Sequence, residues 1–317
     1  GNCGLTTPRR VDRRGAHAIL RLMAGMSLFP LGADRAAARP PAAVILRPAA
    51  PTSPLVYASP HSGRHYPDDL LSHSRLDRAA LRRSEDAFVD ELFDAAPSHG
   101  AALVCAGIAR AYVDVNRDAS ELDPAMYAGP LSAEVNARSP RVAAGLGAIP
   151  RVVSEGAEIY RGKLPAAEAH RRIEEVWRPY PAAVAEALGA ARARFGVAIL
   201  IDCHSMPSIG AGDPPADVVL GDRFGASCAG EITRLAESTL QKRGYRVARN
   251  APYAGGYATQ TYGRPGAKRH ALQIEINRAL YMDEAQCRKN DRFDAVKADL
   301  TALVEALAAA AFERRLA

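Results

Sequence analysis

Short apolar runs alternate along this chain with longer amphipathic stretches. Apolar runs that are typical of strands lie at 55–59, 102–106, 110–115, 197–204, 217–220, 245–249 and 270–276. Helical spacing of apolar residues marks 77–96, 165–195, 223–243 and 291–315. Within 165–195 we expect a break or kink near Pro179 and Pro181. The alternation predicts an α/β fold, a single three-layer sandwich around a mixed, mostly parallel central sheet.

Two further features of the pattern indicate where a site lies. Residues 197–204 run from five apolar positions straight into polar ones, as in a central strand buried on both faces. Ligands of such sheets collect beyond the carboxyl ends of the strands. Residues 119–163 are rich in Gly, Pro, Ser and Asn and predict a long excursion of loops, which inside a compact domain is often functional.

The N-terminal part of the chain has a different composition. We predict a poorly structured extension over 1–45 and a single catalytic domain over 46–317, with the Ala-, Pro- and Arg-rich residues 34–54 as a loose lead-in. The apolar stretch 17–33 follows basic residues and is similar to a poor signal-peptide core, although Arg21 interrupts it. We therefore prefer an upstream extension and keep a targeting segment as the alternative.

Composition narrows the class of protein. The chain has 317 residues, 24% of them charged, with a formal net charge of +6. Its arginines are scattered and no basic run is interleaved with aromatic residues, which argues against nucleic-acid binding and leaves a small anionic substrate as an explanation of the charge. No stretch approaches the ~18 apolar residues of a membrane span. Five widely spaced cysteines without a CxxC pair favour a reducing cytoplasm. Nothing in the sequence indicates the oligomeric state.

Polar groups that suit one reaction follow three of the predicted strands. His61 follows 55–59, His204 ends 197–204, and Glu275 stands between two isoleucines near the end of 270–276. Imidazoles suit zinc, and a carboxylate beside the metal serves as a general base. A single histidine is as easily explained by a loop or a core hydrogen bond, but an unpaired buried carboxylate is costly. Glu275 is therefore either buried with a partner or directed into a cleft.

A third metal ligand is expected from the acidic residues of the predicted helix 77–96. Asp86 and Asp90 are four residues apart and would share a helix face. Glu85 falls within the apolar stripe of that helix and is a rival, and a solvated helix face is the alternative for all three.

Candidate substrate-binding residues occupy two further segments. Asn116 and Arg117 leave the predicted strand 110–115 side by side. Tyr257 and Arg264 lie in a Gly-rich segment, where a backbone can approach a ligand closely. A guanidinium matches a carboxylate geometrically, so Arg117 and Arg264 are candidates for anion binding, with surface salt bridges as the alternative.

Several motifs together resemble the N-formylglutamate amidohydrolases. They extend from about residue 52 to 285 and are SPHSGRHYP (59–67), SEDAFVDELF (84–93), AYVDVNRD (111–118), SELDP (120–124), LIDCHSMPS (200–208), PYAGGYATQTYGRPG (252–266) and LQIEINRALYMDE (272–284). The resemblance implies a fold related to zinc carboxypeptidases and aspartoacylases. It also implies His61 and His204 as zinc ligands, Glu275 as the base, and Asn116 with Arg117 as the grip on a substrate carboxylate.

The sequence departs from the carboxypeptidase pattern at one position. Arg64 stands where those enzymes have a glutamate ligand, three residues after the first histidine, and joins the substrate-binding candidates. The remaining ligand is therefore expected to be Asp86, which matches the family's motif aspartate, with Asp90 second. The implied reaction is zinc-dependent hydrolysis of N-formyl-L-glutamate, as in histidine degradation. The alternatives are hydrolysis of another N-acyl amino acid or small peptide, and a metal-free binding protein on the same fold.

Overall fold

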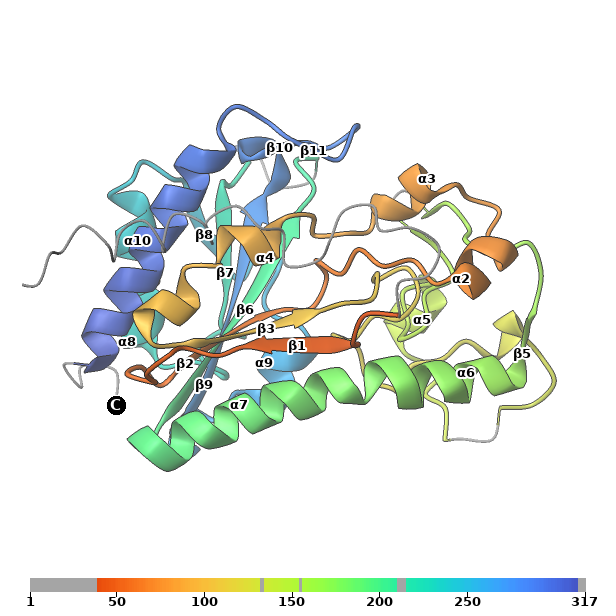
Figure 1. Ribbon diagram of the computed structural model, residues 1–317, viewed down its shortest axis with the longest axis horizontal. Coiled ribbons are helices and arrows are strands. Elements are labelled where there is room, and N and C mark those ends of the chain that lie inside the picture. Colours follow the sequence, from red (N-terminus) through yellow and green to blue (C-terminus); the bar gives the residue numbers. More distant parts are fainter. Residues whose placement is uncertain (1–38, 132–133, 154–155, 210–214, 313–317) are drawn as a thin grey trace, which may run out of the picture. The chain divides into compact units, whose positions relative to one another are not determined.

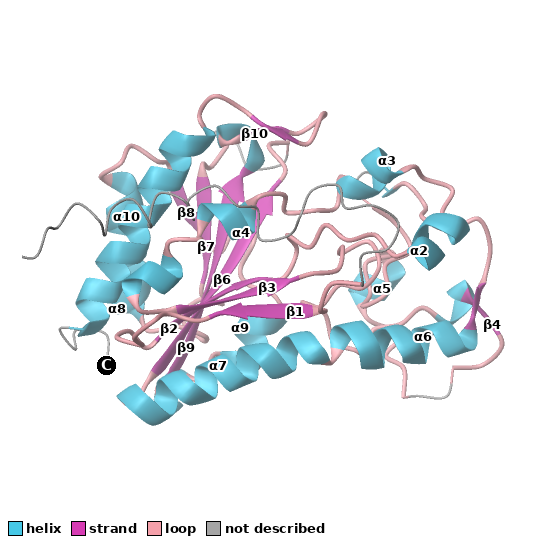
Figure 2. Cartoon of the chain, in the orientation of Figure 1, coloured by secondary structure: helices cyan, strands magenta, loops and turns pink. Residues whose placement is uncertain are grey.

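The computed structural model describes residues 39–131, 134–153, 156–209 and 215–312 (Figures 1 and 2). Within these residues a seven-stranded sheet forms the centre, in the order β1-β3-β2-β6-β9-β7-β8. Its strands are β1 (Ala43–Leu46), β2 (Leu55–Ser59), β3 (Ala102–Ala106), β6 (Ala198–Met206), β7 (Val218–Gly221), β8 (Val247–Arg249) and β9 (Arg269–Asn277).

Strand directions confirm a mixed, mostly parallel sheet. The neighbours β3, β2, β6 and β9 run parallel to one another, and β7 and β8 run parallel as a pair. The edge strand β1 is antiparallel to β3, and β7 is antiparallel to β9. The β6–β9 ladder is the longest and aligns His204 with Glu275. Every residue of β6 is buried, as its unbroken apolar run predicted.

Helices cover the sheet (Figure 1). The long helix α7 (Pro179–Phe195) packs its apolar face against β2 and β6, and Val184, Val56 and Leu200 belong to one buried core. The helices α8 (Gly230–Gln241) and α10 (Phe293–Phe312) pack against each other. Before α7 come α6 (Ala166–Arg172) and a π-helical turn, Ile173–Trp177. This turn directly precedes Pro179, where the missing N–H prevents a regular α-helical bond, so the irregularity expected near the prolines is present.

The continuous helix predicted over 77–96 is wrong. The segment instead forms α3 (Arg78–Arg82), α4 (Val89–Leu92) and the 3₁₀ turn η1 (Ala96–His99). Asp77 caps the first helix, and Phe88 has a left-handed backbone (φ 67°) where α4 begins. The Asp86 N–H bonds the carbonyl of His61 at 3.0 Å. Tertiary contact with the loop after β2 therefore replaces the helical hydrogen bonds that the apolar spacing favours.

The strand predicted over 110–115 is also wrong. These residues form turns, in which the Tyr112 N–H bonds the carbonyl of Ala109 and the Asp114 N–H bonds that of Ala148. The apolar residues Ala111, Tyr112 and Val113 are buried as the pattern required, but in the core beneath the excursion rather than in the sheet.

The excursion 119–163 contains only short elements among its described residues. Within the excursion these are η2 (Pro124–Met126), β4 (Tyr127–Ala128) and α5 (Pro140–Ala143). Short elements described outside it are α2 (Asp68–His73), β5 (Leu164–Pro165), α9 (Tyr257–Tyr262), η5 (Pro265–Ala267), η6 (Arg278–Leu280), β10 (Met282–Asp283) and β11 (Arg288–Lys289). Most of the extension predicted over 1–45 lies outside the described residues, whereas 43–45 belong to β1. Of the helices described, none has the length and apolar character needed to cross a membrane.

Candidate active site

Three buried side chains from separate parts of the chain meet near the carboxyl ends of β2 and β6. His61 follows β2, Asp86 lies in the turn between α3 and α4, and His204 lies in β6. One potential ligand atom of each lies within 4.8 Å of the others. Asp86 Oδ2 is 3.3 Å from Nδ1 of His61 and 2.9 Å from Nδ1 of His204. Both imidazoles therefore direct the same nitrogen to one point.

The opposite ring nitrogens are held by two further carboxylates. His61 Nε2 lies 2.7 Å from Asp114 Oδ1, and His204 Nε2 lies 3.1 Å from Asp202 Oδ2. Asn116 Nδ2 donates to Asp202 Oδ2 at 3.3 Å and lies 3.0 Å from His204 Nε2. A carboxylate on the far nitrogen fixes the ring, and this is the usual arrangement of metal-binding histidines, in which a cation would take the place of the proton on the near nitrogen.

Arg278 holds the other carboxylate oxygen of Asp86, Oδ1. Arg278, which begins η6 directly after β9, donates from Nη2 to Asp86 Oδ1 at 2.9 Å and from Nε to Ser205 Oγ at 3.1 Å. Burial alone would raise the pKa of Asp86, but hydrogen bonds from His204 and His61, together with the charge of Arg278, hold this pKa well below its usual range. Asp86 is therefore ionised, with one oxygen held by Arg278 and the other facing the histidines.

Glu275 lies next to this cluster on the neighbouring strand. Its register partner across β6–β9 is His204, and its Oε1 accepts a hydrogen bond from Gln273 Nε2 at 2.9 Å. Burial, together with the charges of Asp86 and Asp202, raises the pKa of Glu275 to about 7, although the charges of His204 and Arg110 partly oppose the shift. A carboxylate with a pKa near neutrality is suited to taking up and releasing a proton at physiological pH.

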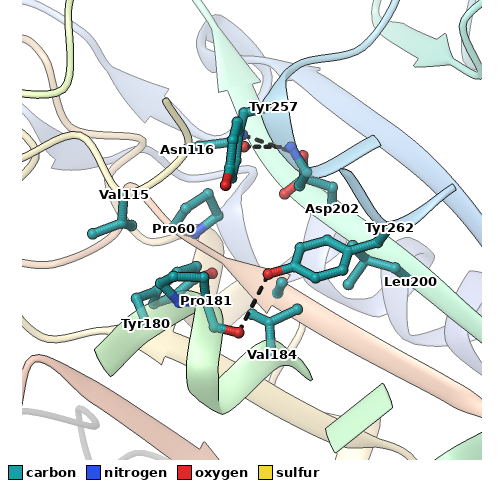
Figure 3. A pocket seen from close by; sticks show the side chains of 12 residues that line it. Pro60, Val115, Asn116, Tyr180, Pro181, Val184, Leu200, Asp202, Tyr257 and Tyr262 are labelled. Atoms are coloured by element: carbon teal, nitrogen blue, oxygen red, sulfur yellow. Dashed lines mark hydrogen bonds between the residues drawn. The ribbon is translucent and has the colours of Figure 1, made fainter. Parts of the chain in front are cut away.

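These groups line a cleft of about 520 Å³, a size that accommodates a small molecule. The described residues that line it include His61, Asp86, Arg110, Asp114, Asn116, Arg117, Arg141, Leu146, Val152, His204, Tyr253, Glu275 and Arg278. A second cavity of about 10 Å³, lined by residues that include Asn116, Asp202 and Tyr257, shares Asn116 with this cleft (Figure 3). It is large enough for one water molecule at most, so the larger cleft is the candidate substrate site.

The donor set fits a divalent metal ion. Two imidazole nitrogens and one carboxylate oxygen, with an open side towards a cleft, are the ligand types of a catalytic zinc site. Asp86 is ionised, and the carboxylates on both far nitrogens orient the imidazoles. Burial lowers the pKa of His204, but Asp202 and Asp86 raise it above its usual value, so a bound cation would displace a proton from this imidazole.

Comparison with known proteins identifies the family of the chain. The family model described as N-formylglutamate amidohydrolase matches residues 53–282, most of the chain. The chain belongs to this family. Amidohydrolases of the family are hydrolases that act on an amide bond, and the matched residues include every side chain of the cluster.

The alignments with relatives of this amidohydrolase span most of the chain. It is 32% identical over 270 residues to N-formylglutamate deformylase of Pseudomonas aeruginosa, a match that spans 82% of this chain and 95% of that protein. The enzyme of the same name from Pseudomonas putida is 30% identical over 82% of this chain and 94% of its own length. The crystal structure of N-formylglutamate amidohydrolase from Ralstonia eutropha JMP134 superposes with a TM-score of 0.81 and 38% identity, covering 86% of this chain and 98% of that one.

Most of the residues predicted for the site of this amidohydrolase meet in the cleft. They are His61, Asp86, Asn116, Arg117, His204 and Glu275. The rival ligands do not meet there: Asp90 accepts two hydrogen bonds of 2.7 Å from Arg64, and Glu85 is engaged by Tyr66 and Arg82. Because the helix is broken at Phe88, Asp86 and Asp90 do not share a face.

Three predicted substrate-binding residues lie outside the lining of the cleft. Arg64 is directed to Asp90 and Glu91. Arg264 folds back on its own segment, where Nη1 donates to the carbonyls of Gln260 at 2.6 Å and Gly263 at 2.7 Å. Tyr257 lines the small cavity and packs edge-on against Trp177. The structure does not bring these three side chains to the candidate site.

Several residues of the site were not predicted. They are Arg110, Asp114, Arg141, Asp202, Gln273 and Arg278. Four of them carried a signal in the sequence. Asp202 and Gln273 each stand two residues before a predicted site residue on a predicted strand and so share its face. Asp114 stands in the motif AYVDVNRD, and Arg278 stands in LQIEINRALYMDE. Arg141 carried no such signal, because it lies in the excursion, where the spacing of residues does not predict which way a side chain points.

Proposed function

We propose that the protein hydrolyses N-formyl-L-glutamate to formate and L-glutamate with one divalent metal ion, most consistent with zinc, held by His61, Asp86 and His204. The observation that carries the proposal is the convergence of these three buried donors beside Glu275 in a cleft of about 520 Å³. The names of the curated relatives, N-formylglutamate deformylase, support the substrate.

A bound zinc ion supplies Lewis acidity, which polarises a carbonyl group and lowers the pKa of water to about 7. The chain's own residues do the rest. Asp114 and Asp202 orient the two imidazoles, and Arg278 holds Asp86. Glu275 takes a proton from the attacking water and delivers it to the departing amine nitrogen, a transfer for which a pKa raised to about 7 by burial is suited.

Arg117 is the candidate for binding the α-carboxylate of the substrate. Its Nη1 donates to the carbonyl of Asn116 at 2.9 Å and its Nε to that of Leu146 at 3.2 Å. These bonds fix the guanidinium at the cleft without a carboxylate partner closer than Asp114 at 3.7 Å. Asn116 contributes by holding Asp202 and the N–H of Ala258 rather than by reaching the substrate alone.

A substrate panel with metal analysis tests the proposal. The purified protein is assayed for metal by elemental analysis, then stripped with a chelator and reloaded with zinc. N-formyl, N-acetyl and longer N-acyl forms of glutamate are compared with N-formylmethionine and with small peptides. We expect zinc-dependent turnover with the highest kcat/KM for N-formylglutamate.

Two results would contradict the proposal in different ways. A preference for another acyl group or amino acid would favour the broader N-acyl amino acid amidohydrolase. Binding of N-formylglutamate without metal or turnover would favour a binding protein on this fold.

The setting of the reaction is also part of the proposal. We place the enzyme in histidine catabolism in the cytoplasm. Cys105, Cys203, Cys228 and Cys287 are all unpaired thiols, which suits a reducing compartment. Fractionation of the native host, with growth on histidine as nitrogen source after deletion of the coding sequence, tests both points.

A further inference from the structure

Among the described residues, four arginines line the cleft, and their partners divide them into two kinds. Arg278 donates to Asp86 at 2.9 Å and Arg110 to Asp114 at 2.9 Å. Both bonds have the length of a charge-assisted hydrogen bond, so these two guanidinium groups are already satisfied by the protein. Arg117 and Arg141 make only longer ion pairs, of 3.7 Å and 3.9 Å.

The partner of Arg141 is itself engaged elsewhere. Glu121 accepts a hydrogen bond of 2.5 Å from Ser139 Oγ through Oε1, and its Oε2 lies 3.9 Å from Arg141 Nη1. That separation exceeds the hydrogen-bond range. The Arg141 side chain is 38% exposed, and it lines the cleft. Its guanidinium can therefore accept an anion as a partner without breaking a bond within the protein.

Arg110, Arg117 and Arg141 are close enough for their positive charges to interact. Burial lowers the pKa of Arg117, and the nearby charges of Arg110 and Arg141 lower it further. Like charges that repel across a cleft favour the binding of an anion between them. One carboxylate of a ligand at Arg117 leaves Arg141 available for a second.

The surroundings of Arg141 suit a short aliphatic chain that ends in a carboxylate. Arg141 lies in α5, which begins after Ser139, whose hydroxyl accepts the backbone N–H of Arg141 at 3.2 Å. Apolar side chains of the same segment line the cleft beside it, namely Ala144, Leu146, Pro150, Val152 and Val153. Methylene groups pack against such a surface while the terminal charge remains accessible to the arginine.

We propose that Arg141 binds the distal, side-chain carboxylate of the substrate and thereby selects N-formyl amino acids with an acidic side chain. This inference rests on the proposed function. The sequence had suggested Arg264 as an anion-binding residue, but its guanidinium donates to backbone carbonyls of its own segment. The inference assigns the second carboxylate to Arg141 instead.

The test compares N-formyl-L-glutamate with N-formyl-L-glutamine, which keeps the shape and the α-carboxylate but lacks the distal charge. For Arg141→Gln we expect kcat/KM for N-formylglutamate to fall about 10- to 100-fold, the cost of one lost charge-assisted contact, with N-formylglutamine unchanged within about twofold. Arg141→Lys should recover part of the loss, because lysine keeps the charge but not the two parallel donors. The matched control is Arg264→Gln, which should leave the ratio of the two substrates at the wild-type value.

The outcomes separate the inference from the proposed function. A wild-type preference for N-formylglutamate that persists in Arg141→Gln would overturn the role of Arg141 and leave the proposed function intact. An equal fall for both substrates would show that Arg141 serves the fold or the α-carboxylate, and would also overturn the inference. A wild-type enzyme that prefers N-formylglutamine would overturn the proposed substrate and the inference together.

Discussion

The carboxyl ends of β2, β6 and β9 and the excursion 119–163 both contribute to the cleft, but they are built differently. The strand ends carry His204 and Glu275 in a continuous ladder of nine paired residues, with every paired side chain of β6 buried. The described part of the excursion forms short helices and strands of two to four residues, namely α5, η2 and β4. Single backbone bonds fasten it, such as those of Ala148 to Glu121 and of Asp114 to Ala148, both 2.8 Å.

This difference assigns different tasks to the two regions. Groups that hold a metal and move a proton must be positioned within a fraction of an ångström, which a rigid ladder provides. Side chains that select a substrate can lie on loops supported by that scaffold. We therefore expect changes at the strand ends to affect metal binding and kcat, and changes in the excursion to affect KM and selectivity.

The largest effect is expected from His204→Ala. Disturbing a hydrogen bond to a ligand typically weakens metal binding by about 10- to 100-fold. Loss of one of the three donors themselves should weaken zinc binding by more than this. Turnover should fall in parallel, and far-UV circular dichroism should be unchanged. The measurement is metal stoichiometry after dialysis together with kcat. A variant that retains full metal content would remove His204 from the ligand set.

Glu275→Gln should separate chemistry from metal binding. We expect about a 10²-fold or larger fall in kcat, as for a lost general base, with zinc content kept. A base acts when deprotonated, so wild-type kcat/KM should rise with pH and level off above the pKa of Glu275. Burial raises that pKa to about 7, and a bound cation lowers it, so the acidic limb should lie at or below about pH 7. The limb should be absent in Glu275→Gln. An unaltered pH profile in the variant would mean that another group is the base.

Asp202→Asn should have an intermediate effect, exerted through His204. The amide keeps the shape but removes the charge beside Nε2, which lies 3.1 Å away. Zinc affinity should fall by about 10- to 100-fold, and excess zinc should restore most of the turnover. Competition with a fluorescent chelator measures the affinity. Loss of turnover that excess zinc does not restore would indicate a role in the fold instead.

The smallest effect on the chemistry is expected from Arg172→Met, which loosens the support of the excursion. Arg172 is fully buried, stacks 4.1 Å from the Tyr112 ring and donates to the Tyr160 hydroxyl at 2.8 Å. Its removal should lower the free energy of unfolding by about 2 kcal/mol, because a desolvated cation–π contact and a buried hydrogen bond are lost. KM should rise while zinc affinity stays at the wild-type value.

The control for this change is Arg178→Met, whose exposed pair with Glu174 should contribute little to the free energy of unfolding. Urea denaturation measures the stabilities. A fall in zinc affinity as large as that of Asp202→Asn would show that the excursion and the strand ends are not independent.

Prediction from the sequence succeeded where periodicity and burial determine the structure. The strand 55–59 and the long buried strand ending at His204 are present because unbroken apolar runs fit only a position covered on both faces. Prediction failed for 77–96 and 110–115, where the apolar residues are buried in short helices and turns rather than in one helix and one strand. Local propensity is a weak constraint when tertiary hydrogen bonds, such as that from Asp86 N–H to His61, offer the backbone an alternative.

The amino-acid sequence was sufficient to predict the α/β class, the strand ends that carry His61, His204 and Glu275, and the membership of the family. It could do so because these properties follow from patterns local to each segment. The sequence favoured Asp86 over Asp90 as the third group, and the folded chain places Asp86 beside the histidines. That Arg264 turns away and that Arg141 reaches the cleft could be seen only in the folded chain. Those outcomes depend on the direction of side chains in irregular segments, and long-range contacts rather than residue spacing fix that direction.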